Sequence, residues 1–215
     1  MSVQRLLPYH QFQDWYSKIA DSSEVSRPAN ASKAVSTILR VWLPKGIHQL
    51  FCPAAYFTAV EYGENRIPVS PFTDVIFDIG CGTGLVCAQM ALSYGCRSYG
   101  VEIEQEYVTT YRTKVAPTLP NATLNLISIE NGDMTNSPEP GTVYHQGLST
   151  ATIFLCNNLV MSEVDSRTNS SPMTRIQKNL ATFLRDQGRV GRQVRLVTSS
   201  VLSVWKGPDF DLLHN

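Results

Sequence analysis

The 215-residue sequence lacks an excess of either charge, because 18 Lys and Arg residues are balanced by 18 Asp and Glu residues. It also lacks any apolar run that approaches the roughly 18 residues of a membrane-spanning helix. Its five cysteines form no C-x-x-C pair and no metal-ligand spacing, and an odd number suits a disulfide framework poorly. With 43% hydrophobic residues the chain is too apolar to be disordered. These features exclude a membrane-spanning protein, and they predict a folded intracellular chain without a bound metal.

The charge is unevenly distributed along the chain. Residues 1–174 hold 11 basic and 15 acidic side chains, residues 175–206 hold seven basic and one acidic, and residues 207–215 hold two acidic. The net charges of these parts are −4, +6 and −2. The basic residues of the middle segment are Arg175, Lys178, Arg185, Arg189, Arg192, Arg195 and Lys206. Such a segment is able to bind phosphate or an acidic protein surface, although a solvated helix face followed by a loop has the same composition.

Strand and helix patterns alternate from residue 74 onward. An apolar run at 75–79 precedes a glycine-rich turn, a helical segment that ends near residue 93, and an apolar run at 97–101. This order predicts a parallel crossover and an open α/β sheet that binds its ligand at the carboxyl ends of the strands. Further strands are predicted at residues 123–129, 151–156 and 194–199, and helices at 11–20, 34–43, 105–115 and 172–186.

Three glycines occupy the turn after the first of these strands, in the sequence Asp78-x-Gly80-x-Gly82-x-Gly84. Residues without a Cβ allow the backbone to approach a ligand closely, and the helix that follows offers free N–H groups. A dinucleotide-binding turn would carry its third glycine at position 85, where this sequence has Leu85. The turn therefore predicts a cofactor other than a nicotinamide dinucleotide.

Two carboxylates follow the next two predicted strands. Glu102 comes 18 residues after Gly84, where it is able to accept hydrogen bonds from both hydroxyls of a ribose. Asp133 is able to accept one from an adenine amino group, with Met134 against the ring. Each residue alone has another interpretation: Glu102 is also typical of the start of a helix, and Asp133 is also typical of a turn. Together they indicate an adenosine bound without a pyrophosphate cradle, and hence S-adenosylmethionine as cofactor.

These motifs resemble those of the seven-stranded methyltransferases that use S-adenosylmethionine. The resemblance implies an α/β fold with a seven-stranded Rossmann-like sheet and a small N-terminal helical extension. Residues 1–50 are expected to form the extension and residues 51–215 the catalytic domain.

The sequence after the fourth predicted strand narrows the resemblance. Asn157 and Asn158 stand where enzymes that methylate planar amines carry Asn/Asp-Pro-Pro-aromatic, and neither proline is present. The doubled asparagine resembles the non-SET histone-lysine methyltransferases, the disruptor-of-telomeric-silencing family. Residues 57–64 (FTAVEYGE), 197–200 (VTSS) and 203–214 resemble further segments of that family, in the family's order.

This resemblance implies a role for each matching residue. Tyr62 and Glu64 would cover the methionine end of the cofactor, and Asn157 would line its junction with the target amine. Aromatic side chains would wall a narrow lysine channel, although such residues also serve as core. The implied catalytic set is Asn157, Tyr62, Phe57, Trp205 and Phe210, and the implied cofactor-binding set is Tyr62, Glu64, Asp78, Gly80, Gly82, Gly84, Leu85, Glu102, Asp133, Met134 and Asn157. Leu85 stands where the family has a glutamine.

The function implied by the resemblance is methylation of a lysine of histone H3 in nucleosomes, in the nucleus. The basic segment 175–206 would then meet nucleosomal DNA or an acidic histone surface. A second hypothesis is a methyltransferase for another protein or a small amine, and a third is a non-catalytic module that binds the cofactor. Methyl transfer from a sulfonium is a direct displacement that depends on alignment of the two reactants, so no metal is expected to be needed.

Overall fold

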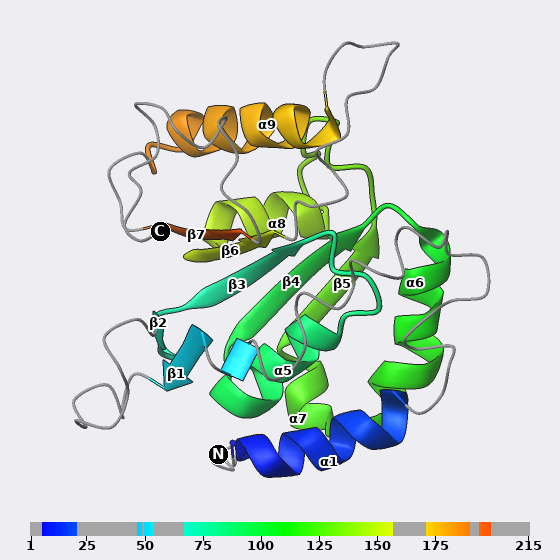
Figure 1. Cartoon of the computed structure of the whole chain (residues 1–215). Helices are drawn as coiled ribbons and strands as arrows, with labels where there is room; N and C mark the ends of the chain where they lie inside the picture. The colour runs from blue at the N-terminus through cyan, green and yellow to red at the C-terminus, as the bar shows by residue number, and fades with distance from the viewer. Residues whose placement is uncertain are drawn as a thin grey trace.

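The computed structural model describes residues 6–20, 47–48, 50–53, 67–156, 171–189 and 194–198. Its centre is a parallel sheet of five strands in the order β5-β4-β3-β6-β7 (Figure 1). The strands are β3 (Val75–Ile79), β4 (Arg97–Glu102), β5 (Ile127–Asn131), β6 (Ile153–Cys156) and β7 (Arg195–Thr198). Strand order reverses at β3, which pairs with β4 on one side and with β6 on the other. Open α/β sheets bind their ligands at such a switch point.

The register of the strands brings the predicted acidic residues to one edge of the sheet. Asp78 is level with Gly100 of β4, and Glu102 is level with Asn131 of β5. Both faces of the sheet are covered, and the central strand β6 is a continuous apolar run whose four residues are all buried. The carboxyl ends of β3, β4 and β5 therefore lie next to one another.

Helices cover both faces of the sheet. On one face lie α8 (Val143–Thr150) and α9 (Pro172–Asp186), which share a core with the strands around Phe77, Phe154 and Leu180 (Figure 1). On the other face lie α5 (Leu85–Tyr94) and α7 (Asn121–Leu124). The long helix α9 is amphipathic over its whole length, as its apolar periodicity predicts.

The N-terminal helix α1 (Tyr9–Ala20) packs on the outer side of α5 (Figure 1). Phe12 of α1 is buried with Ala88 and Leu92 of α5. The Trp15 indole donates a hydrogen bond to the Thr118 hydroxyl at 3.2 Å. The expected extension thus has a helix at Tyr9–Ala20, while its boundary at residue 50 stays a prediction and the expected helix at 34–43 lies outside the described residues.

Two short strands, β1 (Phe51–Pro53) and β2 (Ile67–Val69), form a separate parallel pair. Phe51 and Val69 are buried against Ile76 of the main sheet. Within the part of the chain that the structure describes, the main sheet has five strands, so the expected sheet of seven is confirmed only in part.

Three local predictions differ from the structure. The predicted strand at 123–129 begins only at Ile127, because the N–H groups of Thr123 and Leu124 both bond to the Pro120 carbonyl and close the helical turn α7. The predicted helix at 105–115 is α6 (Gln105–Thr110) followed by a π-helical turn at Tyr111–Val115. Helix α8 was not predicted, because Gly147 and several Ser and Thr residues weaken its helical pattern.

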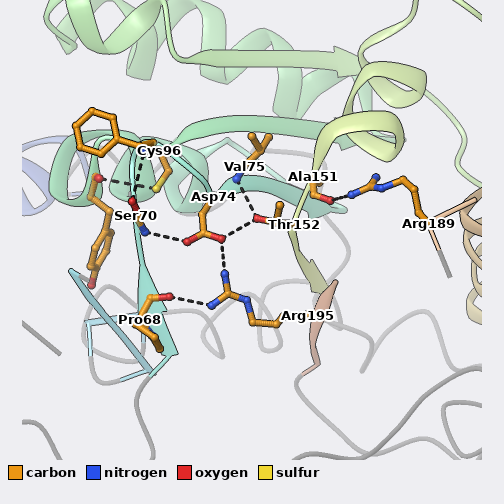
Figure 2. Close-up of polar contacts among 11 residues, drawn as sticks. Pro68, Ser70, Asp74, Val75, Cys96, Ala151, Thr152, Arg189 and Arg195 are labelled. Carbon is orange, nitrogen blue, oxygen red and sulfur yellow. Dashed lines mark hydrogen bonds and ion pairs between the residues drawn. The ribbon is translucent and has the colours of Figure 1, made fainter. Parts of the chain in front are cut away.

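The amino ends of the strands are joined by a polar network around Asp74 (Figure 2). Its carboxylate accepts hydrogen bonds from the Ser70 N–H and the Thr152 hydroxyl, both at 2.8 Å. Arg195 of β7 forms an ion pair with the same carboxylate and also donates to the Pro68 carbonyl at 2.8 Å. One buried carboxylate therefore links β2, β3, β6 and β7.

Replacing Arg195 with Met is expected to lower the free energy of unfolding by about 3 kcal/mol, because it leaves the Asp74 carboxylate buried without its cation. Urea unfolding followed by circular dichroism measures the change. Arg97→Met, at the exposed start of β4, is the matched control and should change stability by no more than about 0.5 kcal/mol. Equal losses in the two variants would show that Arg195 has no special structural role.

Candidate cofactor site

The glycine turn between β3 and α5 has a left-handed backbone at each of its three glycines. The φ angles are 74° at Gly80, 54° at Gly82 and 69° at Gly84. The N–H groups of Gly80 and Cys81 both donate to the Val101 carbonyl, at 3.0 and 3.2 Å, which ties the turn to β4. A Cβ on Gly84 would come within 2.7 Å of the Tyr111 ring, with Ile129 nearer still. Only glycine satisfies both the backbone angle and the packing at this position.

Glu102 lies at the carboxyl end of β4 and faces the glycine turn. Its side chain is buried, and its carboxylate accepts the Gly82 N–H at 2.8 Å and the Glu104 N–H at 3.0 Å. These bonds go to different carboxylate oxygens, and the Ile103 N–H also stabilises the carboxylate. Burial raises the pKa of Glu102, and the backbone hydrogen bonds partly oppose that rise. A diol at this position would have an acceptor for each of its hydroxyls.

Asp78 is the second buried acid of the site, with 3% of its surface exposed. Burial raises its pKa from 3.8 to about 7, and the negative charge of Glu102 adds to the rise. Neither acid has a cationic partner among the described residues. Two acids in such a position favour a positively charged ligand, because a cation between them would offset their mutual repulsion.

Asp133 and Met134 lie in the loop after β5, and the structure gives each of them a local role. Asp133 is exposed, and its carboxylate accepts the Thr135 N–H at 2.9 Å, as in the turn that the sequence also allowed. Met134 is buried in the core that β3 and β4 share with α8 and α9. Gly132, just before them, donates its N–H to the Glu102 carbonyl at 3.0 Å, so the loop adjoins the Glu102 end of β4. Their adenine contacts stay predictions.

The remaining predicted site residues are distributed as follows. Leu85 begins α5, and its half-buried side chain packs against the apolar cluster shared with α1, so it offers the turn no polar group. The predicted positions Tyr62, Glu64, Phe57, Asn157, Trp205 and Phe210 lie outside the described residues. The structure therefore brings together Asp78, the glycines, Glu102 and the Asp133 loop, which are the cofactor half of the predicted site.

The basic residues of 175–206 do not form a single surface in the described structure. Arg189 donates to the carbonyls of Leu148 and Ala151, and Arg195 is paired with Asp74, all near the amino ends of the strands (Figure 2). Lys178 and Arg185 are exposed and Arg175 is half-buried, all three on α9, whereas Arg192 and Lys206 lie outside the described residues. The prediction that all seven contact a partner is thus weakened for Arg189 and Arg195, whose guanidinium groups hold the fold together.

Two further residues shape the site, Asn131 and Tyr107, and neither was predicted from the sequence. The Asn131 amide donates to the Glu102 and Ile103 carbonyls, at 2.9 and 2.8 Å. Tyr107 of α6 has a buried hydroxyl that finds no hydrogen-bond partner in the part of the chain that the structure describes. Burial together with Glu102, Glu104 and Glu106 raises its pKa to about 12. These roles depend on contacts across the fold, so no local sequence pattern indicates them.

Part of the chain is similar to known methyltransferases. Residues 77–161 match the family model of a methyltransferase domain. No curated protein matches the sequence. Similar solved structures include the methyltransferase domain of bacterial CtHen1 (15% identity, 52% of each chain, TM-score 0.41). Others are the glycopeptide N-methyltransferase MtfA with S-adenosylmethionine (14% identity, 54% of this chain and 44% of that one, TM-score 0.40) and an RNA methyltransferase from Salinibacter ruber (24% identity, 42% and 52%, TM-score 0.31). The chain spans about half of the length of these structures.

The matched segment begins at β3 and contains the glycine turn, Glu102 and the Asp133 loop, so it coincides with the site built above. This segment is thus similar to a methyltransferase domain, and the cofactor of such a domain is S-adenosylmethionine.

The described residues fit this cofactor. S-adenosylmethionine carries an ammonium and a sulfonium, which suit the buried acids Asp78 and Glu102. The two carboxylate oxygens of Glu102 suit its ribose diol. The Tyr107 hydroxyl, which has no hydrogen-bond partner among the described residues, lies within electrostatic reach of that carboxylate. When bound, the cofactor supplies a methyl group on a positively charged sulfur.

The described part of the chain holds neither a cluster of metal-ligating side chains nor a membrane-spanning helix. No group of three or more His, Cys, Asp or Glu residues there is arranged to hold a metal ion. Among those residues, no helix is both long enough and apolar enough to span a membrane.

Proposed function

We propose that this methyltransferase modifies a lysine of the histone H3 globular core in nucleosomes. The proposal rests on the resemblance of residues 52–215 to the non-SET histone-lysine methyltransferases, which reaches beyond the cofactor motifs to the doubled asparagine after β6. One structural observation supports it: basic side chains stand beside the cofactor edge of the sheet.

The first half of α9 carries these basic side chains. Asn179 of α9 donates to the Met134 carbonyl at 3.1 Å, so this part of the helix adjoins the loop that follows β5. Arg175 and Lys178 lie within one helical turn of Asn179, and the Lys178 side chain is exposed. Cations next to a methyl-transfer site would attract an acceptor that carries DNA phosphate or acidic protein.

The acceptor lysine must lose its proton before it is able to attack the methyl group. A free lysine has a pKa of about 10.4, and enclosure by apolar and aromatic walls lowers it. A fall of about two units corresponds to about 2.7 kcal/mol of discrimination against the ammonium form. In this proposal Phe57, Trp205 and Phe210 form the walls, Asn157 positions the amine, and the proton leaves to water.

The decisive experiment offers labelled S-adenosylmethionine to the protein with intact nucleosomes, free histones or no acceptor. Label in histone H3 that is seen only with nucleosomes is the expected result. Label on free histones, other proteins or small amines would show a methyltransferase with a different acceptor. Tight cofactor binding without transfer in any mixture would show a non-catalytic module.

The control variant is Gly80→Arg, because a side chain strains the backbone at this left-handed position (φ 74°). It should bind no cofactor and transfer no methyl group.

A nuclear location follows from the proposed substrate, and fractionation of cells that produce the protein would test it.

A further inference from the structure

The loop that follows β5 is fixed to the end of β4 on one side. Gly132 donates its N–H to the Glu102 carbonyl at 3.0 Å. The Asn131 side chain donates to the same carbonyl at 2.9 Å and to the Ile103 carbonyl at 2.8 Å. The beginning of the loop therefore has a defined position relative to the carboxylate predicted to bind the ribose.

The loop is held on its other side by two side chains from different helices. The Tyr144 hydroxyl of α8 and the Asn179 amide of α9 both donate to the Met134 carbonyl, at 3.0 and 3.1 Å. The same Asn179 nitrogen donates to the Asn136 carbonyl at 2.8 Å. Tyr144 is buried, and burial raises its pKa to about 12 even though a hydrogen bond with Asn179 lowers it. A carboxamide donates two hydrogens in a fork, and here that fork spans two residues of the loop.

Asp133 lies between these anchors. Gly132 on its amino side is tied to β4, and Met134 on its carboxyl side is tied to α8 and α9. Asp133 itself is exposed, and its carboxylate accepts the Thr135 N–H from within the loop. Its position relative to Glu102 therefore depends on the anchors and not on burial of its own side chain.

We propose that Asn179 is a positioning residue for the adenosine half of the cofactor site. By donating to the Met134 and Asn136 carbonyls, it sets the distance between the Asp133 carboxylate and Glu102. That distance must match the separation of the adenine amino group and the ribose hydroxyls in the cofactor. Tyr144 assists by sharing the Met134 carbonyl. The proposal rests on the cofactor and on the adenine contact predicted for Asp133, and it is independent of the methyl acceptor.

The test measures binding of S-adenosylhomocysteine by calorimetry, together with its analogue that carries a carbonyl in place of the adenine 6-amino group. No acceptor is needed, so failure of the histone proposal would leave the result intact. Asn179→Ala should weaken S-adenosylhomocysteine binding about tenfold. It should also reduce the difference in affinity between S-adenosylhomocysteine and the 6-carbonyl analogue, and Asp133→Asn should reduce the same difference. Tyr144→Phe removes one of the two bonds to Met134 and keeps the ring, so it should have a smaller effect in the same direction.

The matched control is Thr182→Ala, at an exposed position one turn further along α9, which should change neither affinity. Thermal melting of each variant reports any general loss of stability. Unchanged affinity in Asn179→Ala would overturn the proposal. Equal weakening of both ligands, or an unchanged ratio in Asp133→Asn, would also overturn it, because the loop would then have no part in recognising adenine.

Discussion

Replacing Asp78 with Asn is expected to weaken S-adenosylmethionine binding roughly 100-fold and to stabilise the cofactor-free protein at pH 8. Burial and the nearby Glu102 raise the pKa of Asp78 from 3.8 to about 7. The folded state therefore holds this proton more tightly than the unfolded state does. As a result, the free energy of unfolding falls as the pH rises from about 4 through 7. At pH 8 the ionised carboxylate destabilises the fold, by about 2–4 kcal/mol, and Asn removes that charge.

The same acid predicts a pH dependence of cofactor binding. The cationic cofactor binds the ionised form of Asp78, so the affinity of the wild-type protein should rise between pH 6 and 8. The profile of Asp78→Asn is the reference, because the cofactor's own titration is common to both proteins. Calorimetry measures both profiles, and Asp186→Asn, at an exposed position on α9, should behave like the wild type. Parallel profiles for the wild type and Asp78→Asn would contradict the assignment of Asp78 to the cofactor's positive end.

Neutralising Arg175 and Lys178 together is expected to lower kcat/KM for nucleosomes roughly tenfold, with no change in cofactor affinity. The reason is their location: they stand beside the cofactor edge, whereas Arg189 and Arg195 are bonded within the fold. If both contact DNA phosphate, the variant Arg175→Gln/Lys178→Gln should also reduce the slope of log affinity against log salt by about 2. Steady-state kinetics and binding at several salt concentrations measure the two effects.

The matched control neutralises the same number of charges elsewhere. Arg97 starts β4 at the amino edge of the sheet and Arg112 lies in the π-helical turn after α6, and both are exposed. Arg97→Gln/Arg112→Gln should retain nucleosome activity. Equal loss in the two double variants would mean that only overall charge matters, and no loss in either would place the acceptor elsewhere.

The sequence predicted where the glycine turn and Glu102 lie in the fold, because the signals for them are local. An apolar run, a glycine turn and a helix occupy residues 75–94 without interruption, and Glu102 ends the very next strand. The alternation of strand and helix then requires that these parts meet at one edge of a parallel sheet. Local spacing sufficed because the hydrogen bonds of the glycine turn to Val101 and Glu102 lie within one crossover unit.

Contacts between distant segments could not be predicted in this way. Arg189 and Arg195 had the composition of a binding surface, yet their partners lie 38 to 127 residues earlier in the chain. Asn179 looks like any polar residue on a helix until α9 packs beside the loop after β5. A capped helix such as α8, whose first N–H groups bond to the Glu130 carboxylate of β5, likewise draws its stability from another element.

The ion pair between Asp74 and Arg195 also sets an order of events during synthesis. Asp74 leaves the ribosome 121 residues before Arg195 does. Until the arginine emerges, burying the carboxylate would cost more than keeping it hydrated, so the amino end of β3 should remain open to water. The nascent domain is therefore expected to gain resistance to proteases in one late step, after β7 has emerged, and not strand by strand.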